Sequence, residues 1–225
     1  MLRDDYIMRL VAQFTRFLTE IIGLRRGGQN TATLTAIDQA LQDLLDLDGD
    51  AVREMTAGDL VNYLTLGESP ILGRDKCIFL ATLLREMGHV FETQKRPADS
   101  YHVRQKALDV MLSEQVVGGG LGLPEYAPTV DGLVADLSEY RLPQDTAIRL
   151  MRHYEQLGQF ARAEDVLFDM LEAQPDDAEL IALGTAFYHR LLTVPDALLA
   201  AGHLPRDEVE AGLAELQESA ASDLS

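Results

Sequence analysis

The chain has 225 residues, of which 47% are hydrophobic. This is enough for one extended domain or two small domains, each with an apolar core. The 37 acidic residues outnumber the 19 basic ones and give a formal net charge of −18, which repels phosphate backbones and argues against a nucleic-acid partner. A single cysteine, Cys77, excludes an internal disulfide, and no apolar run is long enough to span a bilayer. We therefore expect a cytoplasmic protein.

Residues 1–28 are predicted to form an amphipathic helix, Asp5 to Leu24, followed by a short linker. Apolar residues recur at intervals of three and four along it: Ile7, Leu10, Val11, Phe14, Phe17, Leu18 and Ile21. Such a face can pack on the rest of the chain, pair with a second copy in a homodimer, or lie on a membrane surface. Its width favours burial in the protomer or a dimer, because membrane-surface helices usually carry more basic residues.

Residues 29–115 are predicted to form irregular helical hairpins. The apolar periods place helices at about Thr33–Leu47, from Thr56 onward, at Arg74–Thr93 and from Ala98 to Met111. Thr56 and Asp59 form an approximate capping box, and Pro97 suits the first turn of the last helix. Residues 116–128 are rich in glycine and proline and predict a loop that joins two parts of the chain.

Residues 129–217 are predicted to be a helical region similar to tetratricopeptide repeats, after a short helix near Asp131–Tyr140. The repeat spacing is carried by Leu150, Tyr154, Gly158, Phe160, Ala163, Leu167 and Pro175. A second repeat would begin near Ala178, and helices near 196–201 and 205–217 would complete or cap the stack. The expected fold is therefore all-α, an α-solenoid of stacked antiparallel helix hairpins, with a disordered polar tail at 218–225.

Several short patterns suggest chemistry, but each is incomplete. Asp46, Asp48 and Asp50 match the first positions of a calcium loop, which then lacks its glycine and its bidentate glutamate. Glu86 and His89 have the spacing of one half of a di-iron motif, and no second copy follows. The glycine run at 118–122 lacks the lysine of a phosphate-binding loop, and Cys77 lies on an apolar helix face. We therefore expect no catalytic residue, cofactor or metal.

The favoured function is a non-catalytic protein-interaction scaffold, because helical repeats present a concave surface built from the first helix of each pair. On the repeat register the candidate contact residues are Arg152, Glu155, Gln156, His189 and Arg190. The expected partner is an unidentified protein or peptide. Two alternatives remain: a helical enzyme or ligand-binding protein with a pocket near 118–126, and a membrane-associated regulator tethered by the first helix.

Several stretches resemble an uncharacterised bacterial family of all-helical proteins. They are Asp5–Arg9, Ala163–Phe168, Phe187–Tyr188 with Leu191 and Leu192, and Pro205–Val209 with Gly212 and Leu213. The resemblance implies a helical protein whose C-terminal part is similar to tetratricopeptide repeats, and it implies no activity. The acidic middle of the chain and its glycine-rich loop depart from the family pattern.

Overall fold

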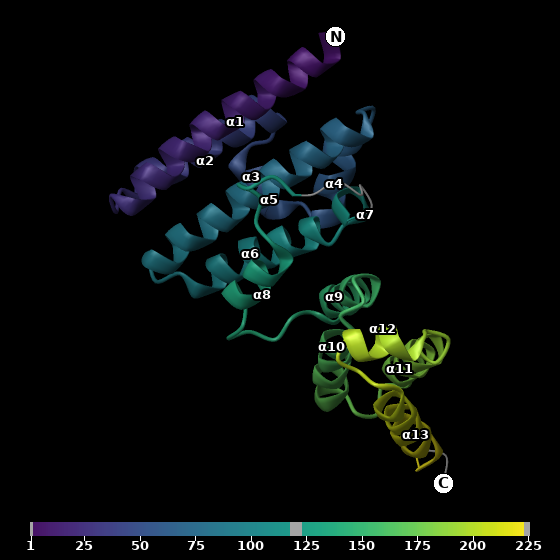
Figure 1. Cartoon of the computed structure of the whole chain (residues 1–225). Coiled ribbons are helices and arrows are strands. Elements are labelled where there is room, and N and C mark those ends of the chain that lie inside the picture. The colour runs from purple at the N-terminus through teal and green to yellow at the C-terminus, as the bar shows by residue number, and fades with distance from the viewer. Residues whose placement is uncertain (1, 118–122, 223–225) are drawn as a thin grey trace. The chain divides into compact units, whose positions relative to one another are not determined.

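The computed structural model describes residues 2–117 and 123–222, and these residues contain helices and no strand. The fold is therefore all-α, as the sequence predicts. The chain divides into two compact units, Met1–Arg141 and Leu142–Ser225, which are described separately below (Figure 1).

The first unit is built around a central helix that is buried along most of its length. Its helices are α1 (Leu2–Arg26), α2 (Asn30–Leu45), α3 (Gly49–Glu54), α4 (Ala57–Thr65), α5 (Pro70–Thr93), α6 (Pro97–Met111), α7 (Glu114–Val117) and α8 (Val130–Asp136). In α5 every residue from Cys77 to Leu84 is buried. A helix that is apolar all round must be covered on all sides, and α1, α2, α4, α6 and α7 pack on α5 (Figure 1).

Helix α1 packs on α2 and α5 of its own unit. Leu10, Phe14, Leu18 and Ile21 form its buried face, and the ring of Phe14 stacks on Phe79 of α5 with 4.1 Å between centroids. At the other end of α1, Nε of Arg25 donates to Oε2 of Glu86 at 2.6 Å. Apolar packing and one partly buried ion pair thus join α1 to α5.

Helices α5 and α6 approach each other closely at Gly88. A Cβ at this position would lie 2.6 Å from Cγ of Arg104, so the arginine stem occupies the space that a side chain would need. Oγ of Ser100 also donates to the Gly88 carbonyl oxygen at 3.0 Å. Glycine is therefore the residue that lets α6 cross α5 at this point.

Lys106 of α6 closes the C-terminal end of the short helix α3. Its Nζ lies 2.7 Å from the carbonyl oxygen of Val52, 2.9 Å from that of Arg53 and 2.6 Å from that of Met55. Helix ends leave such carbonyls without intrahelical partners, and an ammonium has three N–H groups to donate. Each N–H of Lys106 therefore finds a carbonyl acceptor, and the contact fixes α3 to α6.

The second unit contains two packed helix pairs. Its helices are α9 (Gln144–Gln156), α10 (Phe160–Ala173), α11 (Ala178–Leu191), α12 (Asp196–Ala201) and α13 (Arg206–Ser222). α9 and α10 form a hairpin whose turn contains Gly158 at a φ of +70°, a left-handed conformation that suits glycine. α11 packs mainly on α13, with the short α12 between them in the chain.

A buried polar contact joins the helices of the second pair to α10. Tyr188 of α11 is fully buried, and its hydroxyl donates to Oε1 of Glu164 on α10 at 2.7 Å. A Cβ at Gly212 of α13 would lie 2.4 Å from that hydroxyl oxygen. Glycine at 212 thus makes room for the tyrosine, which packs between α10 and α13.

Several helix ends differ from the sequence expectations. The stretch at Asp48–Asp50, expected to be a turn, begins α3, because the Asp48 side chain accepts a hydrogen bond from the Ala51 N–H. α5 begins at Pro70, one turn before the expected Arg74, because Ser69 caps it and proline suits its first position. α8 ends at Asp136, before the expected Tyr140, and α13 continues to Ser222, so residues 218–222 of the expected tail are helical. Residues 118–122 and 223–225 lie outside the described part.

Candidate functional site

The predicted contact residues lie on α9 and α11, the first members of the two helix pairs. Each helix buries one apolar face: Thr146, Ala147, Leu150, Met151 and Tyr154 in α9, and Leu180, Ile181, Gly184, Phe187, Tyr188 and Leu191 in α11. Polar side chains at the intervening positions therefore remain on the surface. Tyr154 is also held from α10, where the guanidinium of Arg162 lies 4.0 Å from its ring centroid.

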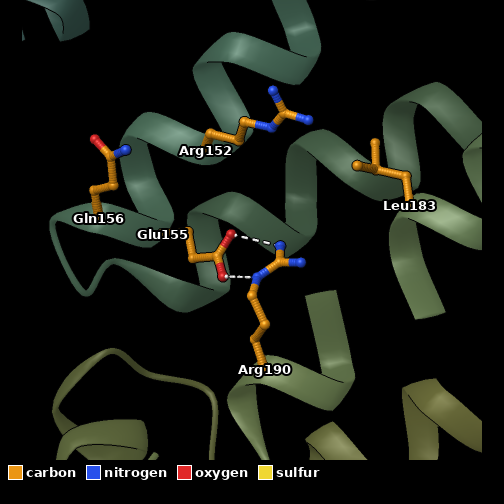
Figure 2. Close-up of a pocket in the computed structure, with 5 residues that line it drawn as sticks. All are labelled: Arg152, Glu155, Gln156, Leu183 and Arg190. Carbon is orange, nitrogen blue, oxygen red and sulfur yellow. Dashed lines mark hydrogen bonds and ion pairs between the residues drawn. The ribbon is translucent and has the colours of Figure 1, made fainter. Parts of the chain in front are cut away.

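The outer faces of α9 and α11 enclose a surface hollow of about 440 Å³, which is within the usual range for ligand pockets. Its lining residues are Arg152, Glu155 and Gln156 of α9 and Leu183 and Arg190 of α11 (Figure 2). Four of the five predicted contact residues thus border one concavity. The fifth, His189, is exposed on α11 and does not line it.

A two-point ion pair bridges the hollow. Arg190 donates from Nε to Oε1 of Glu155 at 2.7 Å and from Nη2 to Oε2 at 2.9 Å (Figure 2). This geometry matches the planar guanidinium to the planar carboxylate, and the hydrogen bonds to Glu155 raise the pKa of Arg190 above its ordinary value. The carboxylate is largely covered, with 17% of the Glu155 side chain exposed. The pair therefore fixes the spacing of α9 and α11 where the hollow forms.

Arg152 contributes a charge to the hollow that no other described residue neutralises. It is exposed, and within residues 2–117 and 123–222 its side chain makes no hydrogen bond or ion pair. Gln156, one turn further along α9, adds an amide that can both donate and accept. Leu183 supplies an apolar wall. The hollow thus offers one available cation, one amide and one aliphatic surface.

This free guanidinium lies in an acidic environment. Residues 142–225 contain sixteen acidic residues, five arginines and no lysine. Arg162 donates to the Tyr154 hydroxyl, and Arg206 donates to the carbonyls of Leu192 and Val194. With Arg190 committed to Glu155, Arg152 is the member of the hollow best placed to meet an anionic group.

Leu183 is the lining residue that the sequence analysis missed. It lies seven positions before Arg190, which is two helical turns, so the two residues share a face of α11. This seven-residue spacing from Arg190 is the signal in the sequence that identifies Leu183 as a residue on the same face. A leucine is usually assigned to the core of a helical pair, and here Leu183 is only partly covered.

The other predicted site patterns have structural partners. Asp48 caps α3, and Asp50 pairs with Arg53. Glu86 bonds Arg25, and Cys77 is fully buried, which raises the pKa of its thiol to about 12 and keeps it protonated. No group of three or more potential ligands among the described histidine, cysteine, aspartate and glutamate residues is arranged to hold a metal ion.

The predicted association face of α1 is divided between covered and partly covered residues. Leu10, Phe14, Leu18 and Ile21 are buried inside the first unit, whereas Ile7, Val11 and Phe17 are half-buried. None of the helices in the described residues combines the length and hydrophobicity needed to cross a bilayer. The alternative of an enzyme or ligand-binding protein expects a pocket near 118–126. Tyr126, at the end of this stretch, packs on Phe14 with 5.1 Å between the ring centroids.

These features define an all-α protein with a polar surface hollow on its second unit. A family model described as a family of unknown function, DUF6483, matches residues 1–221, and the chain belongs to this family. No curated protein and no solved structure matches the chain.

Proposed function

We propose that the protein is a non-catalytic interaction module that binds an extended acidic segment of another protein on the α9–α11 face. The observation that carries this proposal is the hollow to which both helices contribute Arg152, Glu155, Gln156 and Arg190. First helices of successive pairs supply the binding surface in helical-repeat proteins. A similar arrangement of the second unit would give this face the same role.

The chemistry of the hollow supports an acidic partner. Arg152 can pair with a carboxylate, while the amide of Gln156 can bond a peptide group and Leu183 can contact an apolar side chain. The rest of the unit is strongly acidic and would repel a negative charge elsewhere, so an acidic residue of the segment must be placed where it meets Arg152. We therefore expect one or two acidic residues in the bound segment and a neutral flank.

The incomplete catalytic patterns support a role without chemistry. The Cys77 thiol is buried and protonated, and the Glu86 carboxylate is held by Arg25. Catalysis requires a nucleophile or base that can reach a substrate. The Cys77 thiol and the Glu86 carboxylate do not meet this requirement, because one is buried and protonated and the other is paired with Arg25.

Peptide display on the full-length protein tests the proposal. Selected peptides should be enriched in aspartate or glutamate, and their dissociation constants should be measured by fluorescence anisotropy. Removing a charge-assisted hydrogen bond costs about 1.5–3 kcal/mol, so we expect Arg152→Ala to weaken binding by roughly 10- to 100-fold.

Arg26→Ala is the matched control, because it removes the same charge from an exposed position on α1. It should leave the affinity within about twofold, since Arg26 does not line the hollow and exposed charges are strongly screened at physiological salt. Selected peptides without acidic residues, or equal losses in both variants, would refute the proposal.

A further inference from the structure

The first unit contains a second polar hollow, distinct from the proposed interaction face. It has a volume of about 590 Å³ and lies where the turn between α5 and α6 faces α8 and the residues after it. The lining side chains with polar groups are His89, Glu92, Lys95, Ser100, Arg104, Asp136, Ser138, Glu139 and Tyr140. Its size would accommodate a small metabolite.

Arg104 lines this hollow and is almost entirely buried. It is 6% exposed, its Nη2 donates to Glu92 and to Nδ1 of His89, and its Nη1 lies 3.4 Å from the Asp136 carbonyl oxygen. Its buried Nε has no hydrogen-bond partner. A buried donor without an acceptor is costly and therefore rare. This Nε lies against Gly88, where an added Cβ would come within 2.9 Å of it, so the unpaired donor belongs to the α5–α6 crossing.

The hydrogen bond from Arg104 also fixes the protonation of His89. Arginine is only a donor, so Nδ1 of His89, 2.9 Å from Nη2, must accept and carries no proton. The neutral ring therefore keeps its proton on Nε2. His89 is one of the residues that line the hollow.

Most charges around the hollow are already paired. Arg104 pairs with Glu92, and Arg85, from outside the lining, pairs with Asp136 at 2.7 Å. Two lining charges remain, one of each sign: the side chains of Lys95 and Glu139 are exposed and make no hydrogen bond or ion pair with any described residue, including each other. The turn after α5 carries the cation, and the segment after α8 carries the anion.

The conformation of Lys95 places its side chain at this turn. Its φ is +57°, a left-handed value that is uncommon for a residue with a side chain. The turn is closed by hydrogen bonds from the Lys95 N–H to the Glu92 carbonyl and from the Arg96 N–H to the Phe91 carbonyl. Asparagine tolerates this conformation, which makes Lys95→Asn a suitable neutral variant.

We infer that this hollow binds a small zwitterion with one carboxylate and one ammonium group, an amino acid or a close relative. Its carboxylate accepts from the Lys95 ammonium and lies beside the Arg104 guanidinium, which also lines the hollow, and its ammonium pairs with Glu139. A simple anion would leave Glu139 unpaired and repelled, and a simple cation would do the same to Lys95. The ring of Tyr140 and Pro97 offer an apolar surface to the remainder of the ligand.

The experiment is calorimetric titration of the full-length protein with single probes. The probes are the common L-amino acids together with β-alanine, γ-aminobutyrate and 5-aminovalerate, which vary the distance between the two charges. Butyrate and butylamine carry one charge each. At least one zwitterion should bind, with an affinity at least about tenfold above that of butyrate and butylamine, since each single charge forfeits one charge-assisted contact.

Lys95→Asn and Glu139→Gln should each weaken binding of that zwitterion by about tenfold or more. Arg26→Gln and Glu172→Gln change the same charges at exposed positions that do not line the hollow and should leave it unchanged. Unchanged melting temperatures would establish that the variants are folded. The inference is overturned if no probe binds at about 10 mM, if butyrate or butylamine binds as well as the zwitterion, or if binding survives both substitutions.

Discussion

At the scale of single residues, the contact between Tyr188 and Glu164 combines a favourable hydrogen bond with an unfavourable charge. Burial raises the pKa of Glu164, and the nearby Glu208 and Asp165 raise it further, while the hydrogen bond from Tyr188 lowers it. The net direction is upward. The folded state therefore holds the proton of Glu164 more tightly than the unfolded chain does.

This direction predicts that Glu164→Gln stabilises the protein near pH 7. A raised carboxyl pKa contributes stability that is fully present below the ordinary value of 4.5 and is lost as the pH rises through the folded-state value. Glutamine keeps an oxygen acceptor for the Tyr188 hydroxyl and carries no charge. The melting temperature should rise at pH 7, and the gain should shrink towards zero as the pH falls to about 4.5.

Glu172→Gln provides the comparison, because Glu172 is exposed on the same helix. It should change the melting temperature little at either pH. If Glu164→Gln lowers the melting temperature at pH 7, the bond from Tyr188 to a charged acceptor outweighs the burial of that charge.

At the scale of elements, the hairpin of α9 and α10 depends on a small residue. Ala163 is fully buried, at the position where the repeat spacing places the crossing of the two helices. Ala163→Leu should overpack this site and lower the free energy of unfolding by about 1–3 kcal/mol. The measurement is the urea midpoint, with exposed Ala182→Leu on α11 as the control. Equal midpoints for the two variants would contradict the assigned register.

The packing of α1 leads to a separate prediction. Phe14 is fully buried and stacks on Phe79, so Phe14→Ala should destabilise the first unit by about 3–5 kcal/mol. Met8, 69% exposed on the same helix, serves as the control, and Met8→Ala should have little effect. Thermal unfolding followed by circular dichroism distinguishes the two variants. If Phe14→Ala leaves the thermal unfolding unchanged, the packing of Phe14 on Phe79 does not stabilise the first unit in solution.

The local sequence was sufficient for some elements and insufficient for others. Thr56 and Asp59 predict the start of α4, because a helix cap is a contact between residues within one turn. The bond from Arg25 to Glu86 joins residues 61 positions apart, and no helical period encodes such a pair. Four lining residues of the α9–α11 hollow could be predicted from sequence, because the expected repeat register selects polar positions on these two helices. The hollow beside α8 was not, because Lys95 and Glu139 come together only through tertiary packing.

At the scale of the whole molecule, a net charge of −18 opposes the compact state through self-repulsion. Raising NaCl from about 10 mM to about 500 mM shortens the screening length severalfold and should therefore raise the melting temperature. A gain of about 1 kcal/mol would appear as about 2–4 °C for a chain of this length. The rise should be smaller at pH 5, where fewer carboxylates are charged. A fall with salt would show that ion pairs such as Arg25–Glu86 outweigh the repulsion.

The enclosure of Lys106 has a consequence for chemical labelling. The chain has only three lysines: Lys95 is exposed, Lys76 pairs with Glu68 at 2.7 Å, and Lys106 gives its N–H groups to three carbonyls. Burial lowers the pKa of Lys106, yet an amine held in this way cannot reach an acylating reagent until α3 separates from α6. Mass spectrometry can compare the acylation rate of Lys106 with that of Lys95. The rate at Lys106 under native conditions therefore reports how often α3 separates from α6.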